Sequence, residues 1–208
     1  MNRLDKLYQE NPDAAAFADG YLSYLNEVLR RIDVASIARF IELLLDARAR
    51  SATIFFIGNG GSAATASHFA NDLALGTKAQ GRPFRVVSLC DNTAVMTAIG
   101  NDFGYEDLFV RQLAVLAKAG DLVVAISVSG NSPNVTKALE YAALHDLVTV
   151  GLTGFDGGQV RRLASHCVHV PTNAGEYGPA EDAHLVLDHL VGAYLASRCR
   201  LELSGQAS

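Results

Sequence analysis

The sequence predicts an α/β fold in which helices flank a doubly wound, five-stranded parallel sheet. Five short apolar runs rich in β-branched residues alternate with stretches of helical periodicity along the 208 residues. The runs are apolar almost continuously, as expected of strands covered on both faces. Two Gly/Ser-rich loops each follow such a run and open a helix, which is how parallel strands are connected.

The expected elements follow in order. Two helices over 13–32 and 34–49 come first, because apolar residues recur there at helical spacing. The strands are expected at 53–57, 85–89, 122–126, 147–152 and 166–170. Helices fill the intervals at 62–75, about 92–99, 106–118 and 134–145, and a last helix runs from about 179 to 198. We expect one domain over 1–208, with an N-terminal helical segment at 1–50 and an α/β core at 51–200.

Composition excludes several classes of protein. Half of the residues are hydrophobic and 19% are charged, so the chain can bury a sizeable core. The formal net charge of −5 and the absence of a long Lys/Arg run argue against direct nucleic-acid binding. No run approaches the ~20 apolar residues that span a bilayer, and the polar start has no signal-peptide core, so we expect a cytoplasmic protein that does not enter membranes. Cys90, Cys167 and Cys199 lack metal or redox spacing and are expected to be reduced thiols.

The two Gly/Ser-rich loops are FFIGNGGSAATASHF at 55–69 and VVAISVSGNSPNV at 123–135. Each brings unpaired backbone N–H groups and hydroxyls to a helix N-terminus, where the helix dipole favours an anion such as phosphate. Ordinary helix capping and turn chemistry also explain serine and asparagine at these positions. The candidate phosphate ligands are Asn59, Gly60, Gly61, Ser62, Ser127, Ser129 and Ser132.

Three motifs in order carry a resemblance to a known family: GNGGSAATASHFANDL at 58–73, GNDFGYEDLF at 100–109 and AISVSGNSPNV at 125–135. They resemble the sugar-isomerase (SIS) domain in its phosphoheptose isomerase branch, and the likeness extends to EDAHLVLDHL at 181–190. The resemblance implies a parallel α/β sandwich assembled as a homotetramer, with sites at subunit interfaces. It also implies conversion of the phosphorylated sugar sedoheptulose 7-phosphate to D-glycero-D-manno-heptose 7-phosphate, often with bound Zn²⁺.

The resemblance also implies site residues. His68 and Asp72 match a His and Glu pair of the family, with a carboxylate one methylene shorter here, and His189 matches the family's histidine. Glu181 stands where the family has glutamine, and it is also a candidate substrate ligand. Together these four residues form a two-His, two-carboxylate set suited to zinc or another divalent ion. Without the resemblance, a His/Asp pair four residues apart on a helix is commonly a simple hydrogen bond.

Aldose–ketose isomerisation needs a base to move a proton between neighbouring carbons and an acid to stabilise the enediol oxygen. We expect Asp72 to be the base and His189 the acid. Asp102, in the GNDFGY loop, is a candidate ligand of sugar hydroxyls, and an Asx-turn is its alternative role.

Two other functions stay open. Some relatives in this family are non-catalytic proteins that bind sugar phosphates or associate with a replication initiator, and retention of His189 favours an enzyme over that class. Val128 replaces a threonine common in the family, and with Asp72 and Glu181 it departs from the usual pattern. These departures leave room for an isomerase of another phosphosugar.

Overall fold

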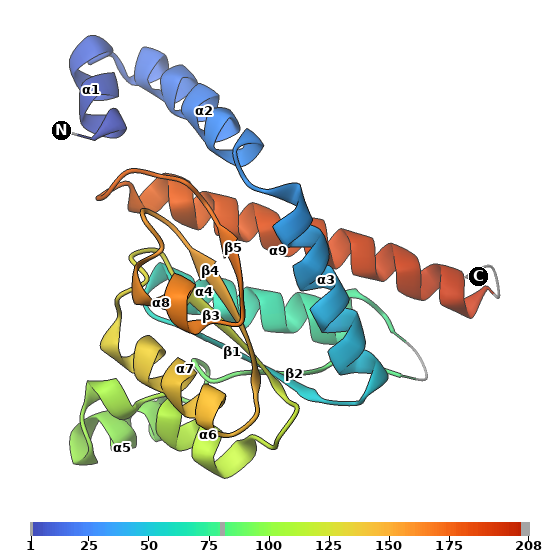
Figure 1. Cartoon of the computed structure of the whole chain (residues 1–208). Coiled ribbons are helices and arrows are strands. Elements are labelled where there is room, and N and C mark those ends of the chain that lie inside the picture. Colours follow the sequence, from blue (N-terminus) through green and yellow to red (C-terminus); the bar gives the residue numbers. More distant parts are fainter. Residues whose placement is uncertain (1, 80–81, 205–208) are drawn as a thin grey trace.

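The computed structural model describes residues 2–79 and 82–204, which contain a five-stranded, wholly parallel sheet (Figure 1). Its strands are β1 (Thr53–Gly58), β2 (Arg85–Ser88), β3 (Leu122–Ser127), β4 (Val148–Thr153) and β5 (His166–His169), in the order β2-β1-β3-β4-β5. The predicted parallel sheet is confirmed, and each strand end lies within one residue of its expected position. Within the described ranges, no helix is both long and apolar enough to cross a bilayer.

The helices are α1 (Arg3–Glu10), α2 (Ala14–Arg30), α3 (Val34–Ala49), α4 (Gly61–Asn71), α5 (Thr93–Asp102), α6 (Val110–Leu116), α7 (Pro133–Leu144), α8 (Gly158–Leu163) and α9 (Tyr177–Leu203). A π-helical turn, η1 (Asp72–Gly76), continues α4, and a 3₁₀ turn, η2 (Tyr105–Asp107), precedes α6. The sequence analysis missed α1 and α8. Helix α1 begins with a capping box between Asn2 and Asp5 and buries none of its residues, and with only eight residues it is too short for the apolar spacing of Leu4, Leu7 and Tyr8 to be recognised. Helix α8 is only six residues long.

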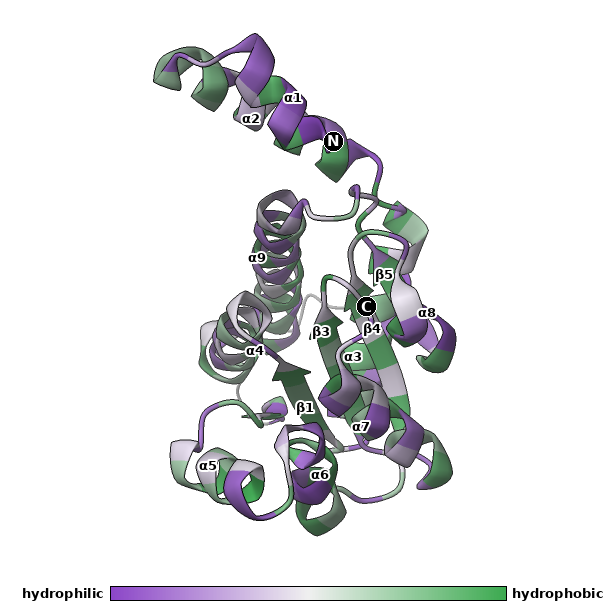
Figure 2. Cartoon of the chain, turned by 90° about the vertical axis from the view of Figure 1, so that its left-hand side faces the viewer, coloured by the Kyte–Doolittle hydropathy of each residue, from purple (hydrophilic) through white to green (hydrophobic). Residues whose placement is uncertain are grey.

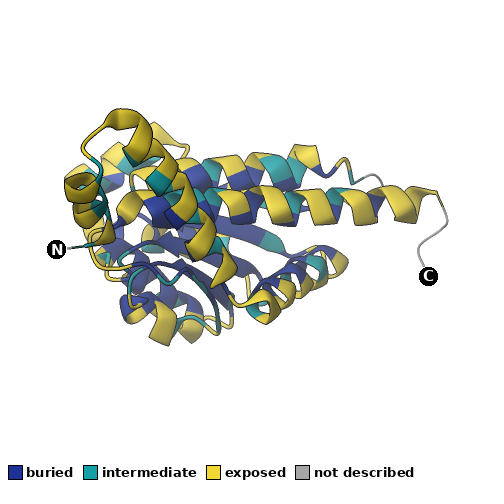
Figure 3. Ribbon diagram, turned by 90° about the horizontal axis from the view of Figure 1, so that it is seen from above, coloured by how far each residue is buried: buried dark blue, intermediate teal, exposed yellow. Residues whose placement is uncertain are grey.

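Alternate residues of each strand supply two separate cores. Ile54 and Phe56 of β1 face the layer of α3, α4 and α9, whereas Phe55 and Ile57 face the layer of α5 to α8. The central strands β1 and β3 are accordingly strongly hydrophobic in Figure 2, and they are buried along nearly their whole length, whereas the edge strands β2 and β5 are more exposed. The last turns of α9 project beyond the rest of the chain (Figure 3).

The strand order reverses between β1 and β3. β1 pairs with β2 on one side and with β3 on the other, and Gly58 at the end of β1 lies opposite Ile126. The loops that follow β1 and β3 therefore lie next to each other at a topological switch point, which is where open parallel sheets bind ligands.

Helices α4 and α9 pack side by side on one face of the sheet (Figures 1 and 2). Gly61 at the start of α4 contacts Glu181 in α9, and Asp72 at the end of α4 lies against Gly192. Residue numbers increase in the same direction along both helices, so the two run parallel from the carboxyl edge of the sheet.

The N-terminal helices are attached to the start of α9 through buried Glu176. Its carboxylate accepts hydrogen bonds from the Tyr24 hydroxyl at 2.5 Å, the Arg3 backbone N–H at 2.6 Å and the Asn173 backbone N–H at 2.9 Å. The Tyr21 hydroxyl donates to Asp182 at 2.5 Å. These contacts fix the first turns of α9, from which Glu181 projects.

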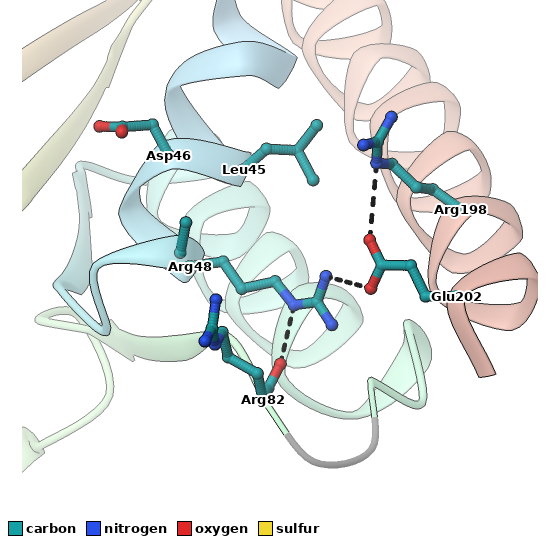
Figure 4. Close-up of a pocket in the computed structure, with 7 residues that line it drawn as sticks. Leu45, Asp46, Arg48, Arg82, Arg198 and Glu202 are labelled. Carbon is teal, nitrogen blue, oxygen red and sulfur yellow. Dashed lines mark hydrogen bonds and ion pairs between the residues drawn. The ribbon is translucent and has the colours of Figure 1, made fainter. Parts of the chain in front are cut away.

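Arg48 joins the far ends of α3 and α9 (Figure 4). Its Nε donates to the Arg82 carbonyl at 2.7 Å, and its Nη1 pairs with Glu202 at 2.8 Å. The Arg48 side chain is only 9% exposed, and that of Glu202 is 34% exposed. Burial protects this ion pair from solvent screening, so it holds the projecting end of α9 against the body of the chain.

We expect Arg48→Leu to lower the free energy of unfolding by about 2 kcal/mol, because it leaves the Arg82 carbonyl without its donor and leaves the Glu202 carboxylate with only Arg198, at 3.6 Å. Urea denaturation measures this change. The control is Arg39→Leu, which removes an ion pair with Glu42 whose side chains are 58% and 62% exposed and which should cost under about 0.5 kcal/mol. Equal losses of unfolding free energy in the two variants would show that the buried Arg48 ion pair stabilises the protein no more than an exposed pair does.

Candidate functional site

A small cavity of about 160 Å³ lies at the switch point between the two Gly/Ser-rich loops. It is lined by residues from β3, both loops and the first turns of α9. The lining residues are Asn59, Ser62, Ile126, Ser127, Val128, Ser129, Ser132, Tyr177 and Glu181. The structure thus brings together serines from loops some 65 residues apart in sequence, as the strand pattern predicts.

Both helices that begin at this cavity lack a side-chain cap. The N-cap residues are Gly60 for α4 and Ser132 for α7, and neither makes a side-chain hydrogen bond to its helix. Gly60 has φ of +53° and ψ of −122°, a conformation that favours glycine. The first N–H groups of both helices therefore have no side-chain cap at the cavity, which suits them to an anion.

The two loops are joined by a reciprocal pair of amides. Asn59 donates to the Asn134 side-chain oxygen at 2.9 Å, and Asn134 donates to the Asn59 oxygen at 2.8 Å. The Tyr105 hydroxyl donates to the same Asn59 oxygen at 2.9 Å. The amide pair holds the two loops at a fixed spacing before any ligand arrives. Sequence reasoning missed Asn134 because nothing local distinguishes it from an ordinary first-turn residue.

The serine hydroxyls of the second loop converge. Ser127 Oγ lies 3.3 Å from Ser132 Oγ and accepts the Gly130 backbone N–H at 3.2 Å. The Ser129 hydroxyl accepts from the Asn131 backbone N–H at 3.3 Å. Val128 lines the same cavity and is 4% exposed, so the hydroxyl that a threonine would bring is absent from the cavity wall.

Glu181 lines the cavity at the start of α9. A Cβ at position 61 would come within 2.5 Å of the Glu181 carboxylate, so glycine at this position leaves room for the Glu181 side chain. Burial raises the pKa of Glu181, and the charge of Asp182 raises it further.

A second polar group lies further along the same two helices. His68 and Asp72 of α4 and η1 and Asp188 and His189 of α9 each offer a ligand atom, and these atoms all lie within 4.8 Å of one another. His68 Nε2 is 3.7 Å from Asp72 Oδ2, and the His68 and His189 rings are 5.1 Å apart between centroids. This group is a possible metal site, since imidazole and carboxylate are ligands for zinc and similar ions.

The composition of this group differs from the set that the sequence analysis expected. His68, Asp72 and His189 are members, but the fourth member is Asp188, and Glu181 is not among them. Glu181 precedes His189 by more than two turns, about 12 Å along the axis, so the two point into different parts of the site. The sequence offers one signal for Asp188, which is its spacing of seven residues from Glu181 on the same helix face.

Asp188 is fully buried, and neither of its carboxylate oxygens has a hydrogen-bond partner within the described residues. Burial raises its pKa to about 7, the negative charge of Asp72 raises it further, and His189 opposes the shift. An unpaired buried carboxylate is costly and calls for a compensating positive charge.

Asp72 marks a change of helix type. It is the first residue of the π turn η1, and its carbonyl accepts from the Thr77 backbone N–H five residues later at 3.0 Å. Single π turns occur often at functional sites, because the wider turn redirects a side chain. Asp72 is thereby presented to α9 beside Gly192, with no bulky side chain between them.

Asp102 does not take part in the cavity. It is exposed at the end of α5, it accepts a hydrogen bond from Asn101 at 2.8 Å, and it is not one of the lining residues. In this loop the side chain that reaches the site is that of Tyr105, through Asn59.

His184 is buried between the two parts of the site on α9, and so it is not a surface residue. Its ring nitrogens have no hydrogen-bond partner in the described part of the chain. Burial lowers the pKa of His184 to about 4, nearby His169 lowers it further, and the Thr153 backbone opposes the shift. His184 is therefore neutral in the folded protein near pH 7.

Fold and cavity together define an α/β domain with a phosphate-competent site at its switch point. A model of the SIS domain matches residues 20–154. The chain is 41% identical to phosphoheptose isomerase of Geobacter sulfurreducens over 79% of its own length and 86% of that protein. A phosphoheptose isomerase of Aneurinibacillus thermoaerophilus is also 41% identical, over 67% of this chain and 70% of the relative.

A solved structure agrees with these relatives. The phosphoheptose isomerase GmhA of Neisseria gonorrhoeae superposes with a TM-score of 0.78 at 33% identity, covering 91% of this chain and 98% of that one. The chain belongs to the phosphoheptose isomerase family of SIS-domain proteins.

We expect the stability of the protein to fall between pH 7 and pH 5 because of His184. Its pKa in the folded state lies below the ordinary value of 6.5, so the unfolded chain binds the proton first as the pH falls. The contribution of the His184 pKa shift to the free energy of unfolding is complete above about pH 6.5 and disappears towards pH 4. His184→Leu should reduce the loss between pH 7 and pH 5 by about 2 kcal/mol, as measured by urea denaturation at each pH.

The matched control is His145→Leu at the exposed C-cap of α7, a substitution that should leave the pH slope as in the wild type. An unchanged slope in His184→Leu would contradict the assignment to His184.

Proposed function

We propose that this chain is an aldose–ketose isomerase that converts sedoheptulose 7-phosphate to D-glycero-D-manno-heptose 7-phosphate through an enediol. One observation carries the proposal. Two parallel helices present a phosphate-competent cavity at their first turns and a His/carboxylate group further along, about 10 Å away. This separation suits a substrate that is anchored by its phosphate and reacts at its other end.

At the phosphate end, backbone N–H groups of Gly60, Gly61 and Ser62 bind phosphate oxygens at the start of α4. The hydroxyls of Ser127, Ser129 and Ser132 donate from the opposite loop, and Asn59 keeps the two loops together. Glu181 accepts hydrogen bonds from sugar hydroxyls, because a carboxylate is a poor neighbour for phosphate itself. We assign no role to Asp102.

At the reacting end, the Asp72 carboxylate removes the proton from the carbon beside the carbonyl and returns it to the neighbouring carbon. His189 donates a proton to the oxygen that becomes the enediol hydroxyl. The phosphate contacts hold the reacting carbons against these two residues, so that binding energy far from the chemistry lowers its barrier.

The His/carboxylate group also fits a divalent metal, for which we propose zinc. The unpaired, buried Asp188 oxygens and the two imidazoles form a donor set of the right chemistry. His68, Asp72 and His189 would hold the ion together with a fourth group. If Asp72 and His189 are held on the metal in this way, a bound water or the metal itself would take over part of their acid and base roles. When bound, zinc supplies a Lewis acid that polarises a substrate oxygen.

We also infer that the protein is a cytoplasmic homotetramer with sites at subunit interfaces. Val186, Leu190 and Tyr194 recur every four residues along α9 and are 39%, 44% and 48% exposed. This apolar stripe adjoins His189, and a second subunit packed on it would close the open side of the site.

The proposal is tested by incubating metal-analysed protein with sedoheptulose 7-phosphate and following the products by NMR, with and without a chelator. We expect heptose 7-phosphate to form and the turnover to disappear with the chelator. Binding of the sugar phosphate without turnover would instead indicate a non-catalytic protein or an isomerase of another phosphosugar.

Asp72→Asn should lower kcat at least a hundredfold, because an amide cannot accept the proton, and it should leave affinity for a phosphate ester within about threefold. Kinetics and calorimetry measure the two quantities, and metal content is determined in the same samples. A variant that keeps its turnover would remove Asp72 from the role of base.

A further inference from the structure

We propose that an apolar groove beside β2 binds a small organic anion with an apolar body, and that this ligand and a phosphate in the cavity at the switch point strengthen each other's binding. The groove measures about 500 Å³ and lies between the edge strand β2, α5 and α6. Both helices belong to the layer on the face of the sheet opposite α9 (Figure 1). Binding in the groove is independent of the proposed function, whereas the coupling rests on the phosphate site of that function.

The wall of the groove is exposed apolar surface. Val87 of β2 is 39% exposed, because β2 is an edge strand that α5 and α6 cover only in part. Phe103, Val115 and Leu116 also line the groove and are 51%, 83% and 50% exposed. A contiguous apolar surface of this kind marks a place where a ligand or partner binds. Its volume is in the range of pockets that hold small organic molecules.

The groove carries one positive charge. Among the described residues that line it, Arg111 is the only charged one. Its Nε donates to Asp107 at 2.7 Å, and its guanidinium carbon lies 3.4 Å from the centroid of the Phe103 ring. Asp107 also pairs with Lys137, so these three charged side chains keep a net positive charge.

Arg111 is therefore oriented before any ligand arrives. Its two terminal nitrogens make no hydrogen bond or ion pair within residues 2–79 and 82–204. A fixed guanidinium with unused donors is suited to an acid group such as a carboxylate or sulfonate. The occupant that fits both the wall and Arg111 has an aliphatic or aromatic body and one acid group.

The same charge disfavours a second copy of the chain as the occupant. If two copies met groove to groove about a two-fold axis, their Arg111 side chains would approach each other. No acidic residue lines the described part of the groove to pair with the second guanidinium.

A short segment joins the groove to the cavity at the switch point. Phe103 lines the groove, and Tyr105 donates from its hydroxyl to Asn59 at 2.9 Å. Gly104 lies between them with φ of +101°, a conformation that lets the two rings serve different sites. Asn59 lines the cavity.

Asp107 supplies a second connection. It accepts from Arg111 in the groove and from Lys137 of α7, the helix whose first turn lies at the cavity. A ligand that fixes Phe103 and Arg111 thereby fixes the contacts of Tyr105 and Lys137. Because coupling between two sites is reciprocal, phosphate in the cavity should strengthen binding in the groove by the same factor.

The probes are the dye anilinonaphthalene sulfonate and its neutral analogue phenylnaphthylamine, which has the same rings without the sulfonate. Fluorescence titration gives their dissociation constants. We expect one saturable site per chain, and Val115→Glu should weaken the sulfonate dye at least tenfold, because it places a carboxylate on the groove wall. The matched control is Leu144→Glu at the end of α7, where the replaced side chain is 81% exposed, and it should stay within twofold. Unchanged affinity in Val115→Glu would overturn the inference.

The role of Arg111 is tested with Arg111→Gln. We expect the sulfonate dye to bind at least fivefold more weakly and the neutral dye to stay within twofold, because only the acid group loses its partner. Equal weakening of both dyes, or no weakening of either, would contradict pairing of the acid group with Arg111.

Sedimentation of the same variants tests a second subunit as the occupant. Val115→Glu should keep the mass of the wild-type assembly. A smaller assembly in Val115→Glu, but not in Leu144→Glu, would show that another copy of the chain covers the groove and would overturn the inference.

The coupling is measured by repeating the dye titration with saturating inorganic phosphate against chloride of equal ionic strength. Phosphate should tighten the sulfonate dye at least threefold in the wild type and leave it unchanged in Tyr105→Phe, which lacks the hydroxyl bound to Asn59. No tightening in the wild type, or equal tightening in Tyr105→Phe, would refute the coupling through Tyr105. Calorimetry measures phosphate binding directly, so a chain that binds the dye through Arg111 but binds no phosphate would refute the phosphate site and leave the groove assignment standing.

Discussion

The direct pairing of β1 with β3 positions the whole site. Because β2 is placed on the outer side of β1, the first and third strands end side by side, and the loops that leave them share one cavity. Neither loop forms the cavity by itself, since residues of both line it. The site is thus a product of strand order. β1 suits its interior position in that order because both of its faces are apolar and covered by helices.

Helices α4 and α9 convert that cavity into an extended site. They start at the same edge of the sheet and remain in contact from Gly61 and Glu181 to Asp72 and Gly192. Polar side chains of this pair lie first at the cavity, as Ser62 and Glu181 do, and then further along the helices, in the His/carboxylate group. The missing side chain at position 61 and the π turn at Asp72 are local irregularities that keep the two helices in this relation.

Much of this could be predicted from the sequence. Strand positions, the parallel sheet and the convergence of the serines follow from short, almost continuously apolar runs and from loops placed after strands, which are local patterns. Asp188 could not be found in this way. His189 was expected in the site, and adjacent residues on a helix normally point about 100° apart, so its neighbour Asp188 was not expected to face the same group. Asp102, a candidate ligand of sugar hydroxyls, lies outside the cavity lining, because a loop motif does not reveal which of its residues turns inward. Helix α1 was missed because its eight residues give too short an apolar pattern.

The amide pair between Asn59 and Asn134 constrains how this site can change. Each side chain both donates and accepts, so the two positions form a unit. A carboxylate at one position could still accept from the remaining amide, but it would return no donor and would add negative charge beside the phosphate. Two carboxylates would repel each other and separate the loops. Positions 59 and 134 should therefore covary among proteins of this architecture, and a substitution at one of them is tolerated best when the other changes to complement it.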